Sequence, residues 1–228
     1  MIRGWFARAT RRFAKAKSTT PPAARYATLK RAFEQAPHKK NILEIGTFKG
    51  KTAIALIKTA LRHEAKESIH YYGFDLWEDM DEATFANEVS KRRETTMAET
   101  LTRIAEGTGL AKSQIHLFRG FSKDTLWQQL PTLPHMDFIF IDGGHSEETV
   151  DSDWRGCVQL MRDDTTVIFD DYFHFPFGPR VVVDALDRDA FAVELLEPQD
   201  VFPDKFGISP DGLLKINLAK VVRRSKNS

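Results

Sequence analysis

The chain has 228 residues and a mass of 26.0 kDa, which predicts one large domain with a short appendage rather than two domains. Hydrophobic residues make up 42% and charged residues 29%, which excludes collagen-like, low-complexity and fully disordered chains. No apolar run approaches the roughly 20 residues of a membrane-spanning helix. The single cysteine, Cys157, cannot form an internal disulfide. We therefore expect a cytoplasmic protein.

The net charge of +1 conceals an uneven distribution. Residues 1–33 contain nine of the 33 Lys and Arg residues and none of the 32 acidic residues. The rest of the chain is therefore acidic, which argues against a nucleic-acid partner for the main domain.

Residues 1–17 have apolar side chains at helical spacing and basic side chains between them, the pattern of a basic amphipathic helix. Three roles stay open for it: peripheral contact with an anionic membrane, an organellar targeting segment, or a packing interface, including one in a homo-oligomer. The Ser-Thr-Thr-Pro-Pro sequence at 18–22 ends this segment. We expect a main domain over 23–222 and a basic C-terminal tail over 223–228.

Short apolar runs alternate with helical patterns from residue 41 onward. Runs such as Phe138–Ile141 do not alternate with polar residues, as expected of parallel strands covered on both faces. The predicted fold is a Rossmann-like, doubly wound α/β domain with a mostly parallel seven-stranded sheet and helices on both faces. The expected strands are 41–46, 71–76, 114–119, 136–142, 165–170, 191–197 and 213–221, with a helix near 181–188.

Ligands of such sheets bind at the carboxyl ends of the strands. The first of these ends carries the turn Glu44-Ile-Gly46-Thr47-Phe-Lys-Gly50-Lys-Thr52, whose spacing matches neither a Walker loop nor a dinucleotide-binding fingerprint. Its glycines permit a tight turn and close approach of a ligand. Asp75 ends the second strand, where a carboxylate can accept hydrogen bonds from both hydroxyls of a ribose.

Together with Arg119-Gly120-Phe121-Ser122 after the third strand, this pattern resembles the class I S-adenosylmethionine-dependent methyltransferases. The resemblance covers roughly residues 40–220. It implies that the glycine turn lines the methionine end of the cofactor, Asp75 holds the ribose, and the segment from Gly120 to Ser122 flanks the adenine. The full expected cofactor set is Glu44, Gly46, Thr47, Gly50, Thr52, Asp75, Gly120, Phe121, Ser122 and Asp142.

Acidic residues also follow the fourth and fifth strands. Asp142, Asp170 and Asp171 should converge, and three close carboxylates repel one another unless a cation lies between them. Oxygen ligands of this kind suit Mg²⁺, with Mn²⁺ or Ca²⁺ as alternatives. A bound cation would lower the pKa of an acceptor hydroxyl, and His145 is the expected base that removes its proton, with Asp142 beside it.

The sequence D-G-x-H after the fourth strand, followed by D-D after the fifth, resembles the metal-dependent sugar O-methyltransferases of the macrocin O-methyltransferase type. The resemblance implies Mg²⁺ on the aspartates, a His base and a sugar hydroxyl as acceptor. Catechol O-methyltransferases instead carry Lys at the His145 position and Asp-Asn at the Asp-Asp position. The aromatic loop 173–178 is either a wall over the metal or a segment packed on the domain.

We therefore expect an S-adenosylmethionine-dependent, metal-assisted O-methyltransferase acting on a sugar or another polyhydroxylated small molecule. One alternative is a phenol or catechol O-methyltransferase. Another is a non-catalytic cofactor-binding module that docks through the basic helix. The charged segment 77–82 is either a lid over the site or a solvated surface.

Overall fold

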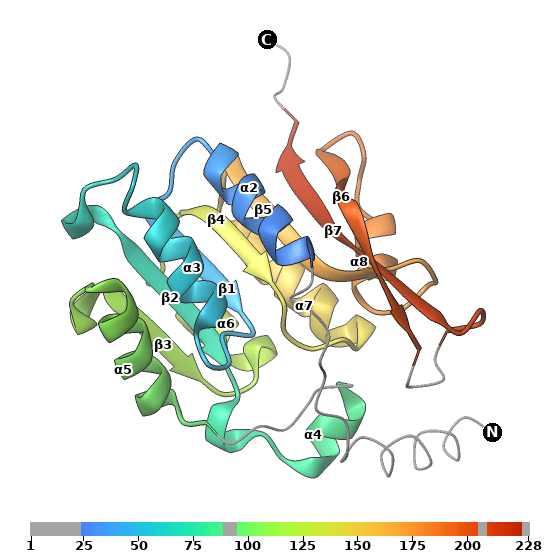
Figure 1. The fold of residues 1–228 in the computed structure, drawn as a ribbon, viewed down its shortest axis with the longest axis horizontal. Coiled ribbons are helices and arrows are strands. Elements are labelled where there is room, and N and C mark those ends of the chain that lie inside the picture. Colours follow the sequence, from blue (N-terminus) through green and yellow to red (C-terminus); the bar gives the residue numbers. More distant parts are fainter. Residues whose placement is uncertain (1–23, 89–94, 205–208, 225–228) are drawn as a thin grey trace.

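The computed structural model describes residues 24–88, 95–204 and 209–224 (Figure 1). The basic helix and linker predicted over 1–22 lie outside these residues, as does the tail beyond residue 224. Among the described residues, no helix is both long enough and apolar enough to span a bilayer.

A single seven-stranded sheet forms the centre of the domain, in the order β3-β2-β1-β4-β5-β7-β6. Strands β1 to β5 pair in parallel, whereas β7 runs antiparallel to both β5 and β6. This topology confirms the predicted Rossmann-like fold. The strands are β1 (Asn41–Ile45), β2 (His70–Asp75), β3 (Ile115–Arg119), β4 (Met136–Ile141), β5 (Met161–Phe173), β6 (Phe191–Pro203) and β7 (Leu213–Arg223).

Helices cover both faces of the sheet (Figure 1). On one face lie α2 (Ala24–Gln35), α3 (Lys51–Ala60) and α5 (Met97–Thr108), and on the other lie α6 (Ser122–Gln129), α7 (Glu147–Cys157) and α8 (Pro179–Asp184). The short helix α4 (Glu82–Asn87) follows β2.

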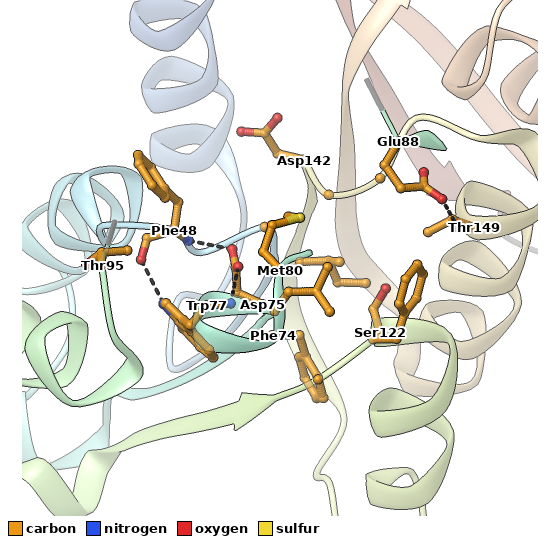
Figure 2. A pocket seen from close by; sticks show the side chains of 17 residues that line it. Phe48, Phe74, Asp75, Trp77, Met80, Glu88, Thr95, Ser122, Asp142 and Thr149 are labelled. Atoms are coloured by element: carbon orange, nitrogen blue, oxygen red, sulfur yellow. Dashed lines mark hydrogen bonds between the residues drawn. The ribbon is translucent and has the colours of Figure 1, made fainter. Parts of the chain in front are cut away.

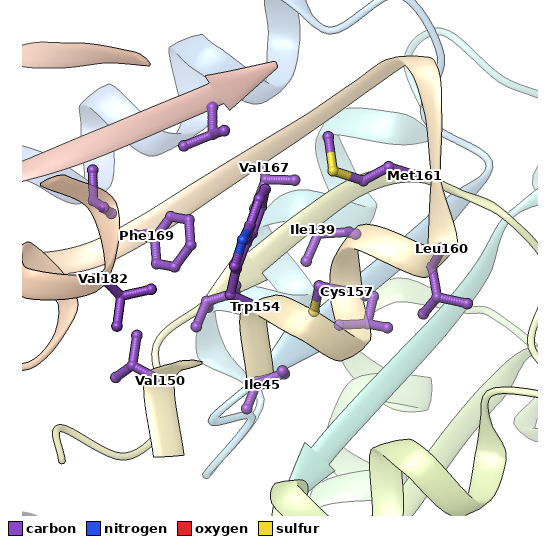
Figure 3. Close-up of a cluster of buried hydrophobic side chains, with 14 of the residues drawn as sticks. Ile45, Ile139, Val150, Trp154, Cys157, Leu160, Met161, Val167, Phe169 and Val182 are labelled. Atoms are coloured by element: carbon purple, nitrogen blue, oxygen red, sulfur yellow. The ribbon is translucent and has the colours of Figure 1, made fainter. Parts of the chain in front are cut away.

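Alternation along the strands divides the apolar side chains between two cores. In β1, Ile42 packs with the α2, α3 and α5 side, whereas Leu43 and Ile45 pack with the α6, α7 and α8 side. Figure 3 shows the second core, where the Trp154 ring of α7 lies 5.7 Å from the Phe169 ring of β5. Parallel strands covered on both faces need apolar residues at every position, which explains the unbroken run Phe138–Ile141.

The predicted strands lie where expected, but β5 and β6 are longer than predicted. The predicted strand 191–197 extends to Pro203 because residues 200–203 pair with Leu213–Ile216 of β7. The predicted helix near 181–188 is α8, which begins at Pro179 and ends at Asp184.

Candidate active site

A cavity of about 240 Å³ opens at the carboxyl ends of β1, β2, β3 and β4 (Figure 2). This is the edge of the sheet where the sequence places its polar residues. The lining residues are Ile45, Gly46, Phe48, Phe74, Asp75, Leu76, Trp77, Met80, Glu88, Thr95, Gly120, Phe121, Ser122, Asp142, Gly143, Gly144 and Thr149.

Gly46 brings the turn after β1 against the turn after β4. Its φ is 92°, and a Cβ at this position would lie 1.9 Å from the backbone oxygen of Asp142. Only glycine permits both this conformation and this approach. The tight turn predicted at Gly46 is therefore present, and it lies against the backbone of Asp142.

Asp75 lies in the middle of the cleft between the turns after β1 and β2 (Figure 2). Its carboxylate accepts hydrogen bonds from the backbone N–H of Phe48 at 2.7 Å and of Trp77 at 3.0 Å. Burial raises the pKa of Asp75, and the backbone N–H groups oppose this rise. The two oxygens are fixed in place and retain lone pairs for a ligand.

Two non-glycine residues of the cleft have positive φ angles, Phe48 at 47° and Trp77 at 42°. The indole Nε1 of Trp77 donates to the carbonyl oxygen of Phe48 at 2.9 Å, which ties the two strained turns together. Backbone strain of this kind persists where the surroundings impose it, commonly at binding sites. Trp77 and Met80 line the cavity, so part of the segment 77–82, expected to be either a lid or a solvated surface, belongs to the cavity wall.

Other members of the expected cofactor set do not line the cavity, namely Glu44, Thr47, Gly50 and Thr52. The Glu44 carboxylate is buried and accepts a hydrogen bond from the Tyr71 hydroxyl, which lies 3.0 Å from Thr47 Oγ1. Burial raises the pKa of Glu44 to about 8. Gly50 begins α3 with a φ of 71°, and a Cβ there would lie 2.6 Å from the Ile104 side chain. Glu44, Thr47 and Gly50 therefore contact the interior of the domain.

The exit of β3 contributes Gly120, Phe121 and Ser122, all of which line the cavity as expected. Gly120 has a φ of 129°, and Phe121 precedes the first residue of α6. The ammonium group of Lys123 lies 5.0 Å from the centre of the Phe121 ring. This arrangement leaves Phe121 in the cavity wall.

Glu88 joins the end of α4 to the loop after β4, a contact that the sequence did not indicate. Its carboxylate accepts hydrogen bonds from the backbone N–H groups of His145 and Ser146, and from the hydroxyls of Ser146 and Thr149, all at 2.9 Å. These donors lower the pKa of Glu88 against the effect of its burial. Glu88 and Thr149 lie together at one wall of the cavity (Figure 2).

Asp142, Asp170 and Asp171 converge as predicted. Burial and the charges of Asp170 and Asp171 raise the pKa of Asp142 well above its usual range. Burial and the neighbouring Asp171 raise the pKa of Asp170 to about 6, although Arg25 opposes this. Of the three, Asp142 lines the cavity, and no hydrogen bond from the described part of the chain reaches its carboxylate.

The positive charge among these carboxylates belongs to Arg25 of α2. Its Nε lies 2.8 Å from Asp170 Oδ1, its Nη2 lies 3.5 Å from Asp171 Oδ1, and its Nη1 lies 3.5 Å from Asp200 Oδ2. Burial alone would lower the pKa of Arg25, but Asp170 and Asp171 raise it. No local motif in the sequence indicates that Arg25 belongs to the site. The sequence feature nearest to it is the absence of acidic residues from 1–33.

His145 lies at the cluster, but both of its ring nitrogens are engaged. Nε2 is 2.6 Å from Asp171 Oδ2, and Nδ1 is 2.7 Å from the carbonyl oxygen of Glu88. Burial would lower the pKa of His145, but Asp171 outweighs it and raises the pKa to about 9. As the side chains lie, the imidazole is an ion-pair partner of Asp171, and its role as the base stays a prediction.

The structure gives no support to the predicted metal set of Asp142, Asp170 and Asp171. In the described ranges, no group of three His, Cys, Asp or Glu residues is arranged to hold a metal ion.

The aromatic loop packs on the domain, since Phe173, Phe175 and Phe177 cluster with residues of β6 and β7.

Comparison with protein families gives a match to the methyltransferase domain over residues 43–172, more than half of the chain. The chain belongs to this family. The prediction of a methyltransferase enzyme is thereby confirmed. The matched segment of this methyltransferase begins in β1 and ends in β5, so it contains Gly46, Asp75 and Asp142. No curated protein sequence matches the chain.

Solved structures with the same fold include three with high coverage. The O-methyltransferase from Bacillus cereus in complex with SAH is 16% identical, with a TM-score of 0.59 over 96% of this chain and 89% of that one. The O-methyltransferase TomG from Streptomyces achromogenes, involved in tomaymycin synthesis and in complex with SAM, is 19% identical, with a TM-score of 0.59 over 95% and 87%. Cofactor-bound Rv0187 from MTB is 13% identical, with a TM-score of 0.58 over 97% and 88%. At these identities, the likeness establishes the fold of this methyltransferase.

Proposed function

We propose that this methyltransferase binds S-adenosylmethionine (SAM) in the cleft at Asp75 and transfers its methyl group to a hydroxyl oxygen of a small polyhydroxylated molecule. The observation that carries the proposal is the cleft itself. Its walls contain the tight turn at Gly46, the carboxylate of Asp75, which backbone hydrogen bonds hold in place, and the half-buried carboxylate of Asp142. Structures of the same fold hold SAM or SAH, which supports this ligand.

The residues present fit SAM. A Cβ at residue 46 would fill the space between the turns after β1 and β4, so the glycine leaves backbone open to a ligand. Asp75 offers carboxylate lone pairs to ribose hydroxyls. Phe121, Trp77 and Met80 provide apolar surface on the walls of the same cavity, suited to a purine ring.

Bound SAM supplies an electrophilic methyl group on a sulfonium sulfur. We assign Asp142 as the group that accepts the acceptor's hydroxyl proton while the O–CH3 bond forms and the S–CH3 bond breaks, with S-adenosylhomocysteine as the leaving group. Its carboxylate lines the cavity, and no hydrogen bond from the described residues reaches it, so in its ionised form it is open to an acceptor hydroxyl. His145 is assigned a positioning role, because its Nε2 holds Asp171 and its Nδ1 faces Glu88.

The predicted divalent metal does not fit the side chains as they lie. Three carboxylates have the donor chemistry of a Mg²⁺ site, and Asp170 Oδ2 is buried without a hydrogen-bond partner among the described residues. However, Arg25 already lies against Asp170 and Asp171, and His145 holds the second oxygen of Asp171. No step of the proposed reaction therefore passes through a metal ion.

A sugar or similar polyol remains the proposed acceptor because of D-G-x-H and D-D at the site. A phenol or catechol acceptor is the second candidate, since phenols ionise more readily and depend less on a base. The third candidate, a non-catalytic cofactor-binding module, is disfavoured because a carboxylate cluster lies next to the cofactor cleft, and a binding module has no need of such a cluster. Two further proposals are a homo-oligomer and a peripheral membrane contact through residues 1–17. Residues 1–17 lie outside the part of the chain that the structure describes.

A transfer assay with methyl-labelled SAM distinguishes these readings. A panel of glycosides, sugar nucleotides, phenols and catechols is incubated with the wild-type protein and with Asp142→Asn. We expect labelled product from polyhydroxylated acceptors, and a much lower turnover for Asp142→Asn while SAM still binds. Product from catechols alone would favour the second candidate, and SAM binding without any product across the panel would count against the proposed acceptor class.

A further inference from the structure

We propose that Arg25 is the built-in cation of the carboxylate cluster and occupies the position where a divalent metal ion would otherwise bind. The inference rests on the proposed function, since it concerns the charge beside the proposed proton acceptor. It adds a residue from α2, outside the matched family segment, to the site.

The backbone of α2 fixes where Arg25 points. Asp200 of β6 accepts hydrogen bonds from the backbone N–H groups of Ala24 at 2.9 Å and Arg25 at 3.2 Å, at the start of the helix. A carboxylate at this position is also favoured by the helix dipole. The first turn of α2 is therefore anchored beside the end of β5, and the Arg25 side chain reaches the cluster from there.

The guanidinium group lies against one oxygen of Asp170 and one oxygen of Asp171, whereas Asp170 Oδ2 has no hydrogen-bond partner among the described residues. Asp170 Oδ1 lies 2.8 Å from Arg25 Nε and also accepts the backbone N–H of Asp171 at 2.7 Å. Asp171 is engaged at both oxygens, by Arg25 at 3.5 Å and by His145 at 2.6 Å. A divalent ion that bound Asp170 Oδ1 and Asp171 would have to displace the guanidinium group and the imidazole, and an ion bound through Asp170 Oδ2 would lie beside the guanidinium charge.

Because the cluster is buried, replacing the guanidinium group by a divalent ion is costly. The Arg25 side chain is only 13% exposed and that of Asp170 only 1%. Breaking a buried ion pair leaves an uncompensated charge, and adding a divalent ion next to a guanidinium brings like charges together. The cluster therefore retains Arg25, which stabilises negative charge near Asp142 without a bound metal.

Tyr26, the next residue of α2, lies on the same side of the site. Asp142 is the largest cause of the raised pKa of the Tyr26 hydroxyl, followed by burial and Asp170. The guanidinium carbon of Arg25 lies 5.2 Å from the centre of the Tyr26 ring. The first turn of α2 thus places a cation and a phenol together beside the proposed proton acceptor.

Equilibrium Mn²⁺ binding, followed by the loss of the free-ion electron paramagnetic resonance signal, tests the inference on the full-length chain. The variants are Arg25→Gln, Asp170→Asn, Arg25→Gln combined with Asp170→Asn, and Arg31→Gln as a control. Arg31 lies on the same helix, but its guanidinium contacts Thr28 Oγ1 and the Glu197 carbonyl oxygen. We expect weak binding to the wild type and to the control. Arg25→Gln should bind Mn²⁺ roughly tenfold more tightly or better, because one opposing charge is removed, and Asp170→Asn should cancel the gain.

Tight Mn²⁺ binding by the wild type that Asp170→Asn abolishes would overturn the inference, and this measurement does not require any Arg25 variant to fold. No gain in Arg25→Gln, or a gain that survives Asp170→Asn, would overturn it as well. SAM affinity measured on the same samples separates the two proposals, because a wild type that fails to bind SAM contradicts the proposed function and leaves the Mn²⁺ result to be judged alone.

Discussion

His145 Nε2 lies 2.6 Å from Asp171 Oδ2, so the histidine that the sequence suggests as a base is an ion-pair partner in the folded protein. The Nδ1 atom is at the same time 2.7 Å from the Glu88 carbonyl oxygen. An imidazole held by two acceptors is stabilised in its protonated form. The pair therefore orients Asp171 and ties the loop after β4 to the end of β5.

The first prediction concerns the titration of His145. Its pKa should be about 9 in the wild type and fall toward the ordinary value near 6.5 in Asp171→Asn. The stability contributed by this pair should be fully present below about pH 6.5 and lost as the pH rises through about 9, since the folded-state pKa is raised. NMR titration of the ring protons measures it, and a wild-type value near 6.5 would refute the ion pair.

The second prediction concerns Asp153 of α7, which is fully buried and whose pKa burial raises to about 7. The folded state then binds the proton more tightly than the unfolded state. Stability should fall as the pH rises from about 4 to about 7 and level off above, by a few kcal/mol at about 1.4 kcal/mol per pKa unit. Asp153→Asn should flatten this dependence in urea unfolding. An unchanged pH profile in the variant would show that another group is responsible.

The sequence predicted the sheet well because its signals are local. The run Phe138–Ile141 indicates a covered parallel strand by itself, and Gly46 and Asp75 follow their strands directly. The position of Arg25 depends on a contact with Asp170 far along the chain, which no local pattern encodes. The positive charge that Arg25 places beside Asp170 and Asp171 comes from α2, a part of the chain far from both carboxylates in sequence.

Glu44 does not line the cavity because of its position along β1. It alternates with Leu43 and Ile45 along β1, so its side chain must enter the core on the α2, α3 and α5 side of the sheet. Its partner there, Tyr71, comes from the neighbouring strand. The alternation of side chains along β1 indicates that Glu44 faces the interior. The family motif at 44–50 indicates instead a cofactor contact for the same residue.

The third prediction compares two glycine substitutions with positive φ. Gly46→Ala should abolish SAM binding and lower the free energy of unfolding by several kcal/mol, because its Cβ would lie 1.9 Å from the Asp142 backbone oxygen at a φ of 92°. Gly212→Ala is the matched control, with a φ of 76° and nothing within 4 Å of its Cβ. It should cost only about 1–3 kcal/mol of backbone strain and leave SAM binding intact. Equal losses in both variants would contradict the close approach at Gly46.

The fourth prediction concerns Glu88, which accepts four hydrogen bonds from His145, Ser146 and Thr149. Glu88→Gln replaces one acceptor oxygen by a donor amide, so at least one buried donor loses its partner at a cost of about 1–3 kcal/mol. SAM affinity should fall as well, because this loop lines the cavity. Glu82→Gln, at an exposed position of α4, is the control for urea unfolding and calorimetry. Identical behaviour of the two variants would remove Glu88 from the site.

The most direct test of the account is calorimetric titration of S-adenosylhomocysteine into the wild type, Asp75→Ala and the control Asp79→Ala. Asp79 is about half exposed and pairs with Arg119 at the surface. We expect binding to the wild type and the control with equal affinity, and a loss of roughly tenfold to a hundredfold in Asp75→Ala, as expected for hydrogen bonds to a charged group. A wild type that does not bind, or binding that Asp75→Ala leaves unchanged, would contradict the assignment of this cleft.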